Sequence, residues 1–365
     1  MKQKKLIIFM PSIEGGGVEK NLFIISKYLA DNIKKVYLIS ASKKYKKKFS
    51  PKIDLVFPKL NIWDKLNRKI KYIVCLFLLL KKIIFERNLL ILCFQANIYC
   101  IILCKIFNIK IIVRSNSSPS GWSKNFFKNL IFKIILKRAD KVLVNSFHFK
   151  KQLNERFNVT SECIYNPLNI KEIRIKSKKK TSKIFTKNKT LKIINIGRLA
   201  DQKDQITLLK SLKLIKNKIN FETVIVGSGN LKNSLIDFTK KNKLQQNIKF
   251  INFVSNPYPL IKQADIFVLS SAYEGLPNVL LESLALNKFI ISSNCPTGPK
   301  EILLNGKGGL LFKVGDSKDL AKKIIYYVNN KSRCNLMLKN AVKELHRFEY
   351  DLNLNKYLSV VNKFI

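Results

Sequence analysis

The regular alternation of short β-branched runs with helical segments constrains the fold of this sequence most. In the first half, strands are predicted over residues 6–10, 35–40, 53–57, 89–94, 109–114 and 141–146. Helical segments separate them, among them an amphipathic run from Val18 to about Ala30 and a long one over residues 63–87. This pattern is typical of a parallel sheet with helices on both faces.

A second alternating set follows a break in the pattern. YNPL (165–168) and a stretch rich in Lys, Ser and Thr, up to Thr190, separate it from the first set. Its strands are predicted over residues 191–197, 221–227, 247–253, 265–270 and 288–293, and the tail from Asp316 onward is predicted helical. A chain of 365 residues exceeds what one hydrophobic core usually holds.

We therefore predict an α/β protein with two Rossmann-like, doubly wound domains facing each other across a cleft. The boundaries are 1–170 for an N-terminal domain, 171–190 for a linker and 191–345 for a C-terminal domain. Residues 346–365 are predicted to form a helix that packs back toward the N-terminal domain. Because open α/β sheets bind ligands at the carboxyl ends of their strands, the cleft is the expected site.

The charge is large and uneven. The net charge is +46, and residues 1–190 hold 42 Lys and Arg against 10 Asp and Glu, or +32, which leaves +14 for the rest. Such a field attracts nucleic acid, anionic lipid or phosphorylated small molecules, although a lysine-biased solvated surface explains part of it equally well. A nucleic-acid-binding protein would show aromatic platforms or a reading module, and the dispersed charge disfavours that class.

Cysteine usage and apolar runs exclude other classes. Seven cysteines stand mostly in apolar runs without a C-x-x-C pair, which indicates reduced thiols in a cytoplasmic protein rather than a structural metal. The N-terminal apolar run is too short for a signal peptide. The longest apolar stretch, residues 72–80, is ended by Lys81 and Lys82, well short of the roughly 20 residues that span a bilayer. The sequence thus predicts no membrane crossing.

Two turns of the second set could bind phosphate. In GRLADQKDQITLL (197–209) a strand ends at Gly197, and Arg198 and Lys203 flank the turn into the next helix. Two cations beside a helix N-terminus suit a diphosphate, although both could equally be surface residues of a loop. In VGSGN (226–230), Gly229 allows close backbone approach to a ligand or belongs to a plain tight turn.

A glycine-rich turn also follows the first predicted strand. EGGGV (14–18) places Gly16 and Gly17 before a helix N-terminus, where the chain can pass close to a charged group. No G-K-[ST] follows, and the third glycine of the dinucleotide fingerprint is missing, so a P-loop kinase or an NAD enzyme is disfavoured.

Two glutamates eight residues apart complete the set of motifs. Glu274 stands in a Gly-Leu-Pro turn and Glu282 in the apolar helical run that follows. In this company the chain resembles the GT-B glycosyltransferases, specifically the retaining family 4 (glycosyl transferases group 1) and its members that build bacterial surface polysaccharides or lipid-linked oligosaccharides. The matching segments are GGG (15–17), GRLADQKD (197–204), VGSGN (226–230), NPYPLIKQADIFVLSS (256–271), YEGLPNVLLESLA (273–285), CPTGPKEIL (295–303) and GGLLF (308–312).

The resemblance implies a role for each of these residues. Glu274 contacts hydroxyls of the donor sugar, Glu282 accepts hydrogen bonds from the ribose, and Arg198 and Lys203 neutralise the leaving diphosphate. Sugar and diphosphate are bound by Gly16, Gly17, Gly229 and the turn Gly275, Leu276, Pro277 and Asn278. Because the sequence lacks the D-x-D pair of metal-dependent transferases, the cations are expected to replace a metal, and no cofactor is expected.

The acceptor side departs from the family pattern. Many members carry a first-domain histidine near the sugar, but only His148 and His346 exist here, and His148 falls where the family has a variable helix start. At the usual position stands IIVRSNSSPSGW (111–122), whose Arg114 and Asn116 are predicted to bind the acceptor or the diphosphate. No general base is identified, which suits retaining chemistry in which the leaving phosphate takes the acceptor proton.

The basic first domain is expected to meet a membrane. Lysines of KKYKKK (43–48) and the 63–87 segment form a basic, partly apolar surface suited to anionic headgroups. The alternative for the 63–87 helix is burial against the first sheet, and both are left open.

The sequence therefore predicts a retaining, metal-independent hexosyltransferase, cytoplasmic and peripheral at the inner face of the cytoplasmic membrane. It would move a hexose or N-acetylhexosamine from a nucleotide diphosphate sugar to a membrane-associated glycan acceptor in O-antigen, capsule, lipopolysaccharide or lipid-linked oligosaccharide synthesis. The expected donors, in order, are UDP-N-acetylgalactosamine, UDP-N-acetylglucosamine and UDP-galactose. The alternatives are a catalytically silent scaffold that binds sugar nucleotides, and a GT-B epimerase of UDP-sugars, which would need a cleft histidine set that is missing here.

Overall fold

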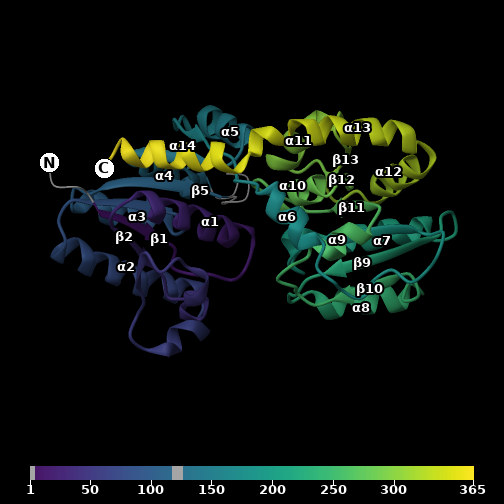
Figure 1. The fold of residues 1–365 in the computed structure, drawn as a ribbon, viewed down its shortest axis with the longest axis horizontal. Coiled ribbons are helices and arrows are strands. Elements are labelled where there is room, and N and C mark those ends of the chain that lie inside the picture. The colour runs from purple at the N-terminus through teal and green to yellow at the C-terminus, as the bar shows by residue number, and fades with distance from the viewer. Residues whose placement is uncertain (1–4, 117–125) are drawn as a thin grey trace. The chain divides into compact units, whose positions relative to one another are not determined.

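The computed structural model describes residues 5–116 and 126–365 and contains two compact units (Figure 1). The first comprises residues 1–167 together with 350–365, and the second comprises residues 168–349. Each unit is built on one parallel sheet with helices on both faces, so the predicted α/β class is confirmed.

The first sheet has seven parallel strands in the order β3-β2-β1-β4-β5-β6-β7. Their bounds are β1 (Lys5–Phe9), β2 (Val36–Ile39), β3 (Ile53–Val56), β4 (Leu89–Cys93), β5 (Lys110–Ser115), β6 (Lys141–Val144) and β7 (Glu162–Cys163). The first six match the predicted strands, and β7 was missed because two residues carry no periodicity. The strand order reverses between β1 and β4.

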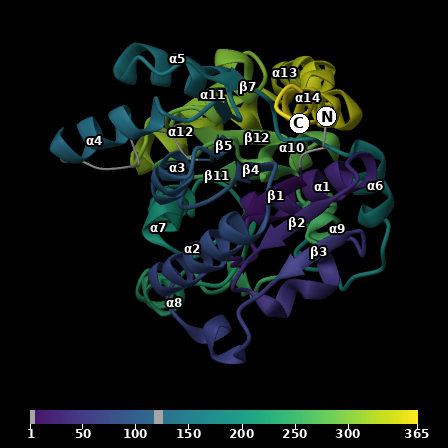
Figure 2. The ribbon, with the colours of Figure 1, turned by 90° about the vertical axis from the view of Figure 1, so that its left-hand side faces the viewer.

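Helices cover this sheet on two faces. One face is covered by α1 (Gly17–Asn32) and α14 (Tyr350–Asn362), and the other by α2 (Arg68–Phe85), α3 (Asn97–Ile106), α4 (Phe126–Leu136) and α5 (Phe147–Phe157). Figure 2 shows α2, α3 and α4 on the same side of the sheet. The segment predicted as one helix, 63–87, is split in the structure. A 3-10 turn over Asn61–Lys65 precedes α2, and the Asn67 side chain caps the start of α2 by accepting a hydrogen bond from the Ile70 N–H. KKYKKK forms a further 3-10 turn, Lys43–Lys48.

The second sheet has six parallel strands in the order β10-β9-β8-β11-β12-β13. They are β8 (Leu191–Ile196), β9 (Phe221–Val226), β10 (Ile248–Ile251), β11 (Ile266–Leu269), β12 (Phe289–Ser293) and β13 (Leu310–Phe312). The helices are α6 (Ile170–Ser177), α7 (Gln205–Ile215), α8 (Lys232–Lys241), α9 (Tyr258–Gln263), α10 (Asn278–Ala285), α11 (Gly298–Ile302), α12 (Ser317–Asn329) and α13 (Lys331–Lys343). Shorter 3-10 turns lie at Asp201–Lys203, Leu304–Gly306 and Glu344–Phe348.

The segment that the sequence suggests as a linker, 171–190, lies within the second unit. Its first part belongs to α6, which packs against α9 and α10. Farther along, Ile184 and Phe185 are buried, and the carboxylate of Glu222 on β9 accepts hydrogen bonds from the backbone N–H groups of Thr186 (2.8 Å) and Lys187 (3.0 Å). These contacts attach the segment to β9 of the second unit, so it is not a free connection.

The last sixteen residues belong to the first unit. There α14 (yellow in Figure 1) packs against α1, and its Leu354, Tyr357, Val360 and Val361 belong to the core on that face of the sheet. The chain therefore returns to its first unit at Tyr350, four residues after the boundary set from the sequence.

All seven cysteines are free thiols, and all but Cys163 are buried. Burial raises the pKa of the Cys75 thiol to about 12, so this group stays protonated at neutral pH. Within the described ranges, 5–116 and 126–365, no helix is long and apolar enough to cross a membrane.

Candidate functional site

The second sheet has its topological switch point between β8 and β11, where the strand order reverses. Parallel strands end at the same edge, so the loops that follow these two strands diverge and leave room for a ligand there. The loop after β8 carries Arg198 and Lys203, and the loop after β11 carries Glu274. The sequence therefore assigned its three main site residues to the position that the topology favours.

Lys203 and Glu274 form an ion pair at this position. Lys203 Nζ lies 2.5 Å from Glu274 Oε1, and the carboxylate is buried, with 6% of Glu274 exposed. Ser271 Oγ donates to the same oxygen at 2.6 Å. The Lys203 stem crosses Gly197, where an added Cβ would meet the stem at 3.5 Å. Two donors thus orient one carboxylate at a strand end, and a cation lies beside it.

Hydrogen bonds fix the two loops to each other. Ser270 Oγ donates to the backbone carbonyl of Lys203 at 2.9 Å, and the backbone N–H of Ala272 donates to the backbone carbonyl of Gln202 at 2.8 Å. The side-chain amide of Gln202 donates to the Tyr273 carbonyl at 3.0 Å. Because these bonds come from two loops 70 residues apart in sequence, the position of Lys203 relative to Glu274 is set before any ligand arrives.

The Gly-Leu-Pro turn is held by the loop after β12. Thr297 Oγ1 donates to the carbonyls of Glu274 (2.8 Å) and Gly275 (3.0 Å), and the Gly298 N–H donates to Gly275 at 2.8 Å. Thr297 has φ 81°, a conformation that β-branched residues rarely adopt. A Cβ at Gly298 would lie 2.2 Å from the Gly275 oxygen. Thr297 was not predicted from the sequence, although the Pro-Thr-Gly-Pro run marks a constrained turn.

Helix α10 begins at the end of this turn. Pro277 is its N-cap, Asn278 its first residue, and Leu276 before them is buried. Glu282, one turn farther, is 6% exposed, and the Tyr258 hydroxyl of α9 lies 3.5 Å from its Oε1. Tyr258 was also missed, because nothing in the sequence pairs α9 with α10.

Gly229 is required by the neighbouring loop. The Leu199 N–H donates to the Ser228 carbonyl at 3.0 Å, and the Leu231 N–H donates to the Leu199 carbonyl at 3.1 Å. A Cβ at Gly229 would lie 2.1 Å from the Leu199 oxygen, so any other residue would push the two loops apart. The structure thereby gives this glycine a packing role, and its contact with a donor stays a prediction.

The glycine turn of the first unit follows β1, beside the switch point of the first sheet. The Gly16 and Glu14 N–H groups donate to the Glu19 carboxylate, at 2.9 and 3.2 Å, and Gly17 is the first residue of α1. Glu19 is 7% exposed. An internal carboxylate thus caps this helix start, and donor binding by Gly16 and Gly17 stays a prediction.

Arg114 is fully buried at the end of β5. Its guanidinium donates to the Tyr357 hydroxyl (2.7 Å), to Asn166 Oδ1 (2.6 Å) and to Asn116 Oδ1, and it lies 5.4 Å from the centre of the Phe94 ring. Asn116, in turn, donates to the Phe94 carbonyl at 2.9 Å and is partly exposed. In this structure Arg114 fastens α14 to the sheet, and Asn116 is the one of the pair that reaches the surface. Residues 117–122 of the predicted acceptor loop lie outside the described residues.

The side chains that the structure brings to the second switch point are polar and cationic. Burial raises the pKa of the Cys295 thiol to about 12, and the charge of Glu274 acts in the same direction. Among the described residues, no group of three or more His, Cys, Asp and Glu side chains could hold a metal ion. What remains is a cation, a positioned carboxylate and a helix start at one sheet edge, a combination suited to a phosphorylated, hydroxyl-bearing ligand.

Residues 176–344 match the family described as glycosyl transferases group 1. The second unit belongs to this family. The group 1 domain thus contains the entire switch-point site, from Gly197 to Gly298, and the resemblance inferred from the motifs is confirmed.

Similar proteins extend the likeness beyond the group 1 domain. An uncharacterized glycosyltransferase of Methanocaldococcus jannaschii is 33% identical over 217 residues, which cover 56% of this chain and about half, 53%, of that relative. A 4-alpha-N-acetylgalactosaminyltransferase of Campylobacter jejuni, named for an N-acetylgalactosamine-N,N'-diacetylbacillosaminyl-diphospho-undecaprenol acceptor, is 26% identical over 87% of this chain and 88% of its own.

A solved structure shares the fold of the whole chain. Anabaena HepE in complex with UDP and glucose has a TM-score of 0.78 at 16% identity, covering 99% of this chain and 100% of that one. At this identity the likeness concerns the fold, which is the two-domain GT-B class of glycosyltransferases.

Proposed function

We propose that the protein is a retaining glycosyltransferase that moves a hexose or N-acetylhexosamine from a UDP-linked donor to a lipid-linked glycan. The observation that carries the proposal is the Lys203–Glu274 pair at the switch point of a group 1 glycosyl transferase domain. A carboxylate oriented by two donors accepts hydrogen bonds from sugar hydroxyls, and a cation beside it suits the adjacent diphosphate.

In the proposed reaction, positively charged side chains stabilise the leaving diphosphate. As the bond between the anomeric carbon and the diphosphate oxygen breaks, negative charge develops on that oxygen, and Arg198 and Lys203 stabilise it. The acceptor hydroxyl attacks the same carbon from the same face, and its proton passes to the departing diphosphate oxygen. Electrons and protons balance without a metal ion, a cofactor or a protein base, and we propose the reaction in this form.

The nucleotide end of the donor is assigned to α10. Glu282 would accept hydrogen bonds from the ribose hydroxyls, and the backbone N–H groups from Gly275 to Asn278 would bind sugar and diphosphate oxygens. Glu282 is 6% exposed and lies beside the Tyr258 hydroxyl, so its carboxylate is held in place before the donor binds. The bonds from Thr297 keep the turn in one conformation, which lowers the entropy lost when the donor binds.

The acceptor end is assigned to the first unit. Asn116, partly exposed and fixed by Arg114, would contact the acceptor glycan, with Arg114 as its positioning residue. The Campylobacter relative is named for an acceptor on diphospho-undecaprenol and for N-acetylgalactosamine transfer, which supports a lipid-linked acceptor and UDP-N-acetylgalactosamine as the first donor to test. With such an acceptor, we propose that the reaction takes place at the inner face of the cytoplasmic membrane.

The test offers the purified chain a panel of UDP-sugars and GDP-sugars in EDTA, with membrane lipid extract as acceptor. Glu274→Gln, which keeps the volume but removes the charge, is expected to lose transfer from the preferred UDP-sugar by about 100-fold or more. Glu222→Gln is the matched control, because this carboxylate is equally buried (7% exposed) but lies near the start of β9, at the other end of the sheet. The anomeric configuration of the product, read by NMR, reports retention.

Three results would contradict the proposal. Transfer that disappears in EDTA and returns with Mg²⁺ would refute metal independence, and an inverted product would refute retention. Full activity of Glu274→Gln would show that the switch-point carboxylate does not contact the donor.

A further inference from the structure

Three neighbouring helices of the first unit, α2, α3 and α4, carry an unusual number of exposed apolar side chains. Of the 22 large hydrophobic residues that the structure describes as exposed, 12 lie on these helices or directly after α3. They are Ile73, Phe77, Ile84, Phe85, Tyr99, Ile102, Ile106, Phe107, Phe127, Leu130, Ile131 and Ile134. Monomeric proteins scatter such residues singly, and a concentration on one surface marks an interaction site.

The spacing of these residues shows that they form outward stripes. Ile73, Phe77 and Ile84 follow one another at intervals of four and seven on α2, whereas Cys75, Leu79 and Ile83 of the same helix are buried against the sheet. Each helix therefore has an apolar inner face, which the core explains, and an apolar outer face, which the fold of the first unit does not use.

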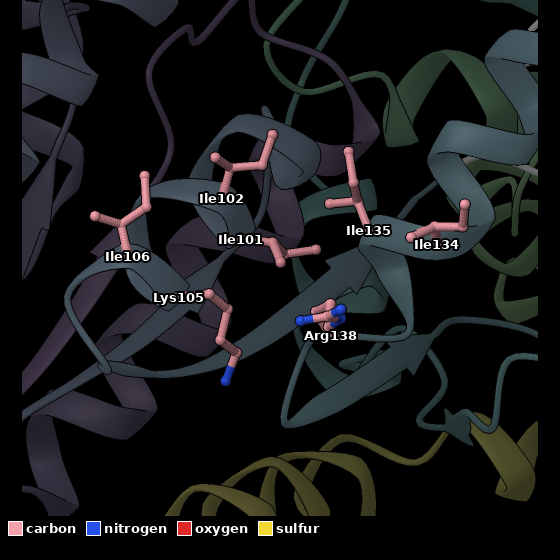
Figure 3. Close-up of a pocket in the computed structure, with 7 residues that line it drawn as sticks. All are labelled: Ile101, Ile102, Lys105, Ile106, Ile134, Ile135 and Arg138. Atoms are coloured by element: carbon pink, nitrogen blue, oxygen red, sulfur yellow. The ribbon is translucent and has the colours of Figure 1, made fainter.

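A groove runs between two of the helices. It has a volume of about 360 Å³ and is lined by Ile101, Ile102, Lys105 and Ile106 of α3 together with Ile134, Ile135 and Arg138 at the end of α4 (Figure 3). Five of the seven lining residues are isoleucines, and the two cations lie toward one side of the groove (Figure 3). Lys105 also pairs with Asp140 at 2.6 Å, which fixes its stem against the groove wall.

The charges around this surface are mostly positive. Residues 68–138, which include all three helices, contain 14 Lys and Arg and a single acidic residue, Glu86. Glu86 is already paired with Lys5 and Lys82. Exposed cations such as Lys81 on α2, Lys128 on α4 and Lys137 directly after α4 stand among the apolar residues. An apolar surface rimmed by cations is complementary to an anionic bilayer, in which acyl chains receive the apolar side chains and phosphates meet the lysines.

We propose that the outer faces of α2, α3 and α4 dock on an anionic lipid bilayer. The sequence indicated such a contact for KKYKKK (43–48) together with the 63–87 segment, with burial of the 63–87 helix as the alternative. The structure shows that one face of α2 is buried against the sheet and that the opposite face carries exposed apolar side chains. The docking surface extends to two helices that the sequence did not connect with it. The inference deepens the proposed function, since it would bring the chain to a lipid-linked acceptor, but its test needs neither donor nor acceptor.

The test measures co-sedimentation of the full chain with vesicles of neutral phosphatidylcholine and with vesicles that contain phosphatidylglycerol. The variant Phe77→Asp/Ile106→Asp/Ile131→Asp places one carboxylate on each helix, at residues that are 67%, 71% and 53% exposed. The matched control is Ile175→Asp/Leu214→Asp/Leu336→Asp, which changes the charge equally on exposed residues of the second unit (68%, 46% and 61%). Circular dichroism confirms that both variants are folded.

The wild-type chain and the control are expected to bind anionic vesicles, and 0.5 M NaCl is expected to weaken this binding about tenfold or more. The docking variant is expected to bind at least about tenfold more weakly than the control. Equal binding of the two variants, equal binding to neutral vesicles, or no binding at all would overturn the proposal. So would a wild-type dimer that the docking variant makes monomeric, because the surface would then join two copies of the chain. Donor hydrolysis, assayed without lipid, reports on the proposed function separately.

Discussion

The buried Arg114 network permits a prediction with a magnitude. Arg114 is fully buried and donates to the hydroxyl of Tyr357, so Tyr357→Phe leaves Nε of a charged group without this acceptor in the core. Hydrogen bonds to charged groups contribute about 1.5–3 kcal/mol, and we expect Tyr357→Phe to lower the free energy of unfolding of the first unit by about 2 kcal/mol. For a unit of this size, such a loss lowers the midpoint of thermal unfolding by roughly 4–8 °C.

The assay can be confined to the first unit. Both tryptophans, Trp63 and Trp122, belong to it, so tryptophan fluorescence in urea follows its unfolding alone. Tyr28→Phe is the matched control: the Tyr28 hydroxyl also bonds to α14, through Asn355, but at the surface, where water replaces the lost partner. We expect this control to change the free energy of unfolding by less than about 0.5 kcal/mol.

A double-mutant cycle decides whether the bond itself is responsible. Arg114→Met removes the charge together with its need for partners, so Tyr357→Phe should cost less in that background, with a coupling of about 1–2 kcal/mol. Additive effects of the two substitutions, or a Tyr357→Phe variant no less stable than the Tyr28→Phe control, would refute the reasoning that this network fastens α14.

Further predictions concern the second unit and the pH dependence of folding. Lys203→Met is expected to lower kcat/KM for the preferred donor by about 100-fold without changing the unfolding midpoint by more than a few degrees; an unchanged kcat/KM would remove Lys203 from the site. Gly229→Ala, whose Cβ would lie 2.1 Å from a carbonyl oxygen, should destabilise the second unit by about 1–3 kcal/mol in urea, and Gly197→Ala, with its nearest contact at 3.5 Å, should cost clearly less. The hydrogen bond from Lys5 lowers the pKa of Glu86 to about 2 from its ordinary 4.5, so the stability it provides is present above pH 4.5 and is lost as the pH falls toward 2. Glu86→Gln should flatten the stability of the first unit over that range, and an unchanged acid titration would show that the pairing contributes nothing.

The spacing of the hydrophobic residues and the composition were sufficient to predict the two parallel sheets. Eleven strands were predicted, and each has a counterpart in the structure, because a buried parallel strand is a short apolar run whatever its neighbours are. The two strands that were missed, β7 and β13, have two and three residues and are defined by pairing with β6 and β12 rather than by their own sequence. The sequence also predicted that residues 346–365 pack back toward the first domain. The structure adds a contact that it could not show, between Tyr357 of α14 and the buried Arg114, 243 residues away in the sequence.

Some residues of the candidate site could be predicted from the sequence and others could not. Arg198, Lys203, Glu274 and Glu282 could be selected from the sequence, because charged residues in glycine-rich turns at strand ends are conspicuous and matched a known family. Their partners could not be selected, since Thr297 and Tyr258 reach Glu274 and Glu282 only through strand order and helix packing. Arg114 could also be selected from the sequence, as a cation at a strand end, but only the structure shows that it is buried among neutral partners and contacts α14. Its part in binding the acceptor stays a prediction.

The sequence by itself determined the two α/β sheets, the family of the second unit and the residues most suited to a sugar nucleotide. These are local properties. They follow from the spacing of hydrophobic residues and from the residue types in the turns, so they can be predicted without knowing the long-range contacts. Only the tertiary structure decided which carbonyl requires Gly229, which groups hold Glu274, and which helices share an outer apolar surface. Those properties depend on contacts between segments far apart in the chain, and long-range contacts are fixed by the packing of the whole unit rather than by any one stretch of residues.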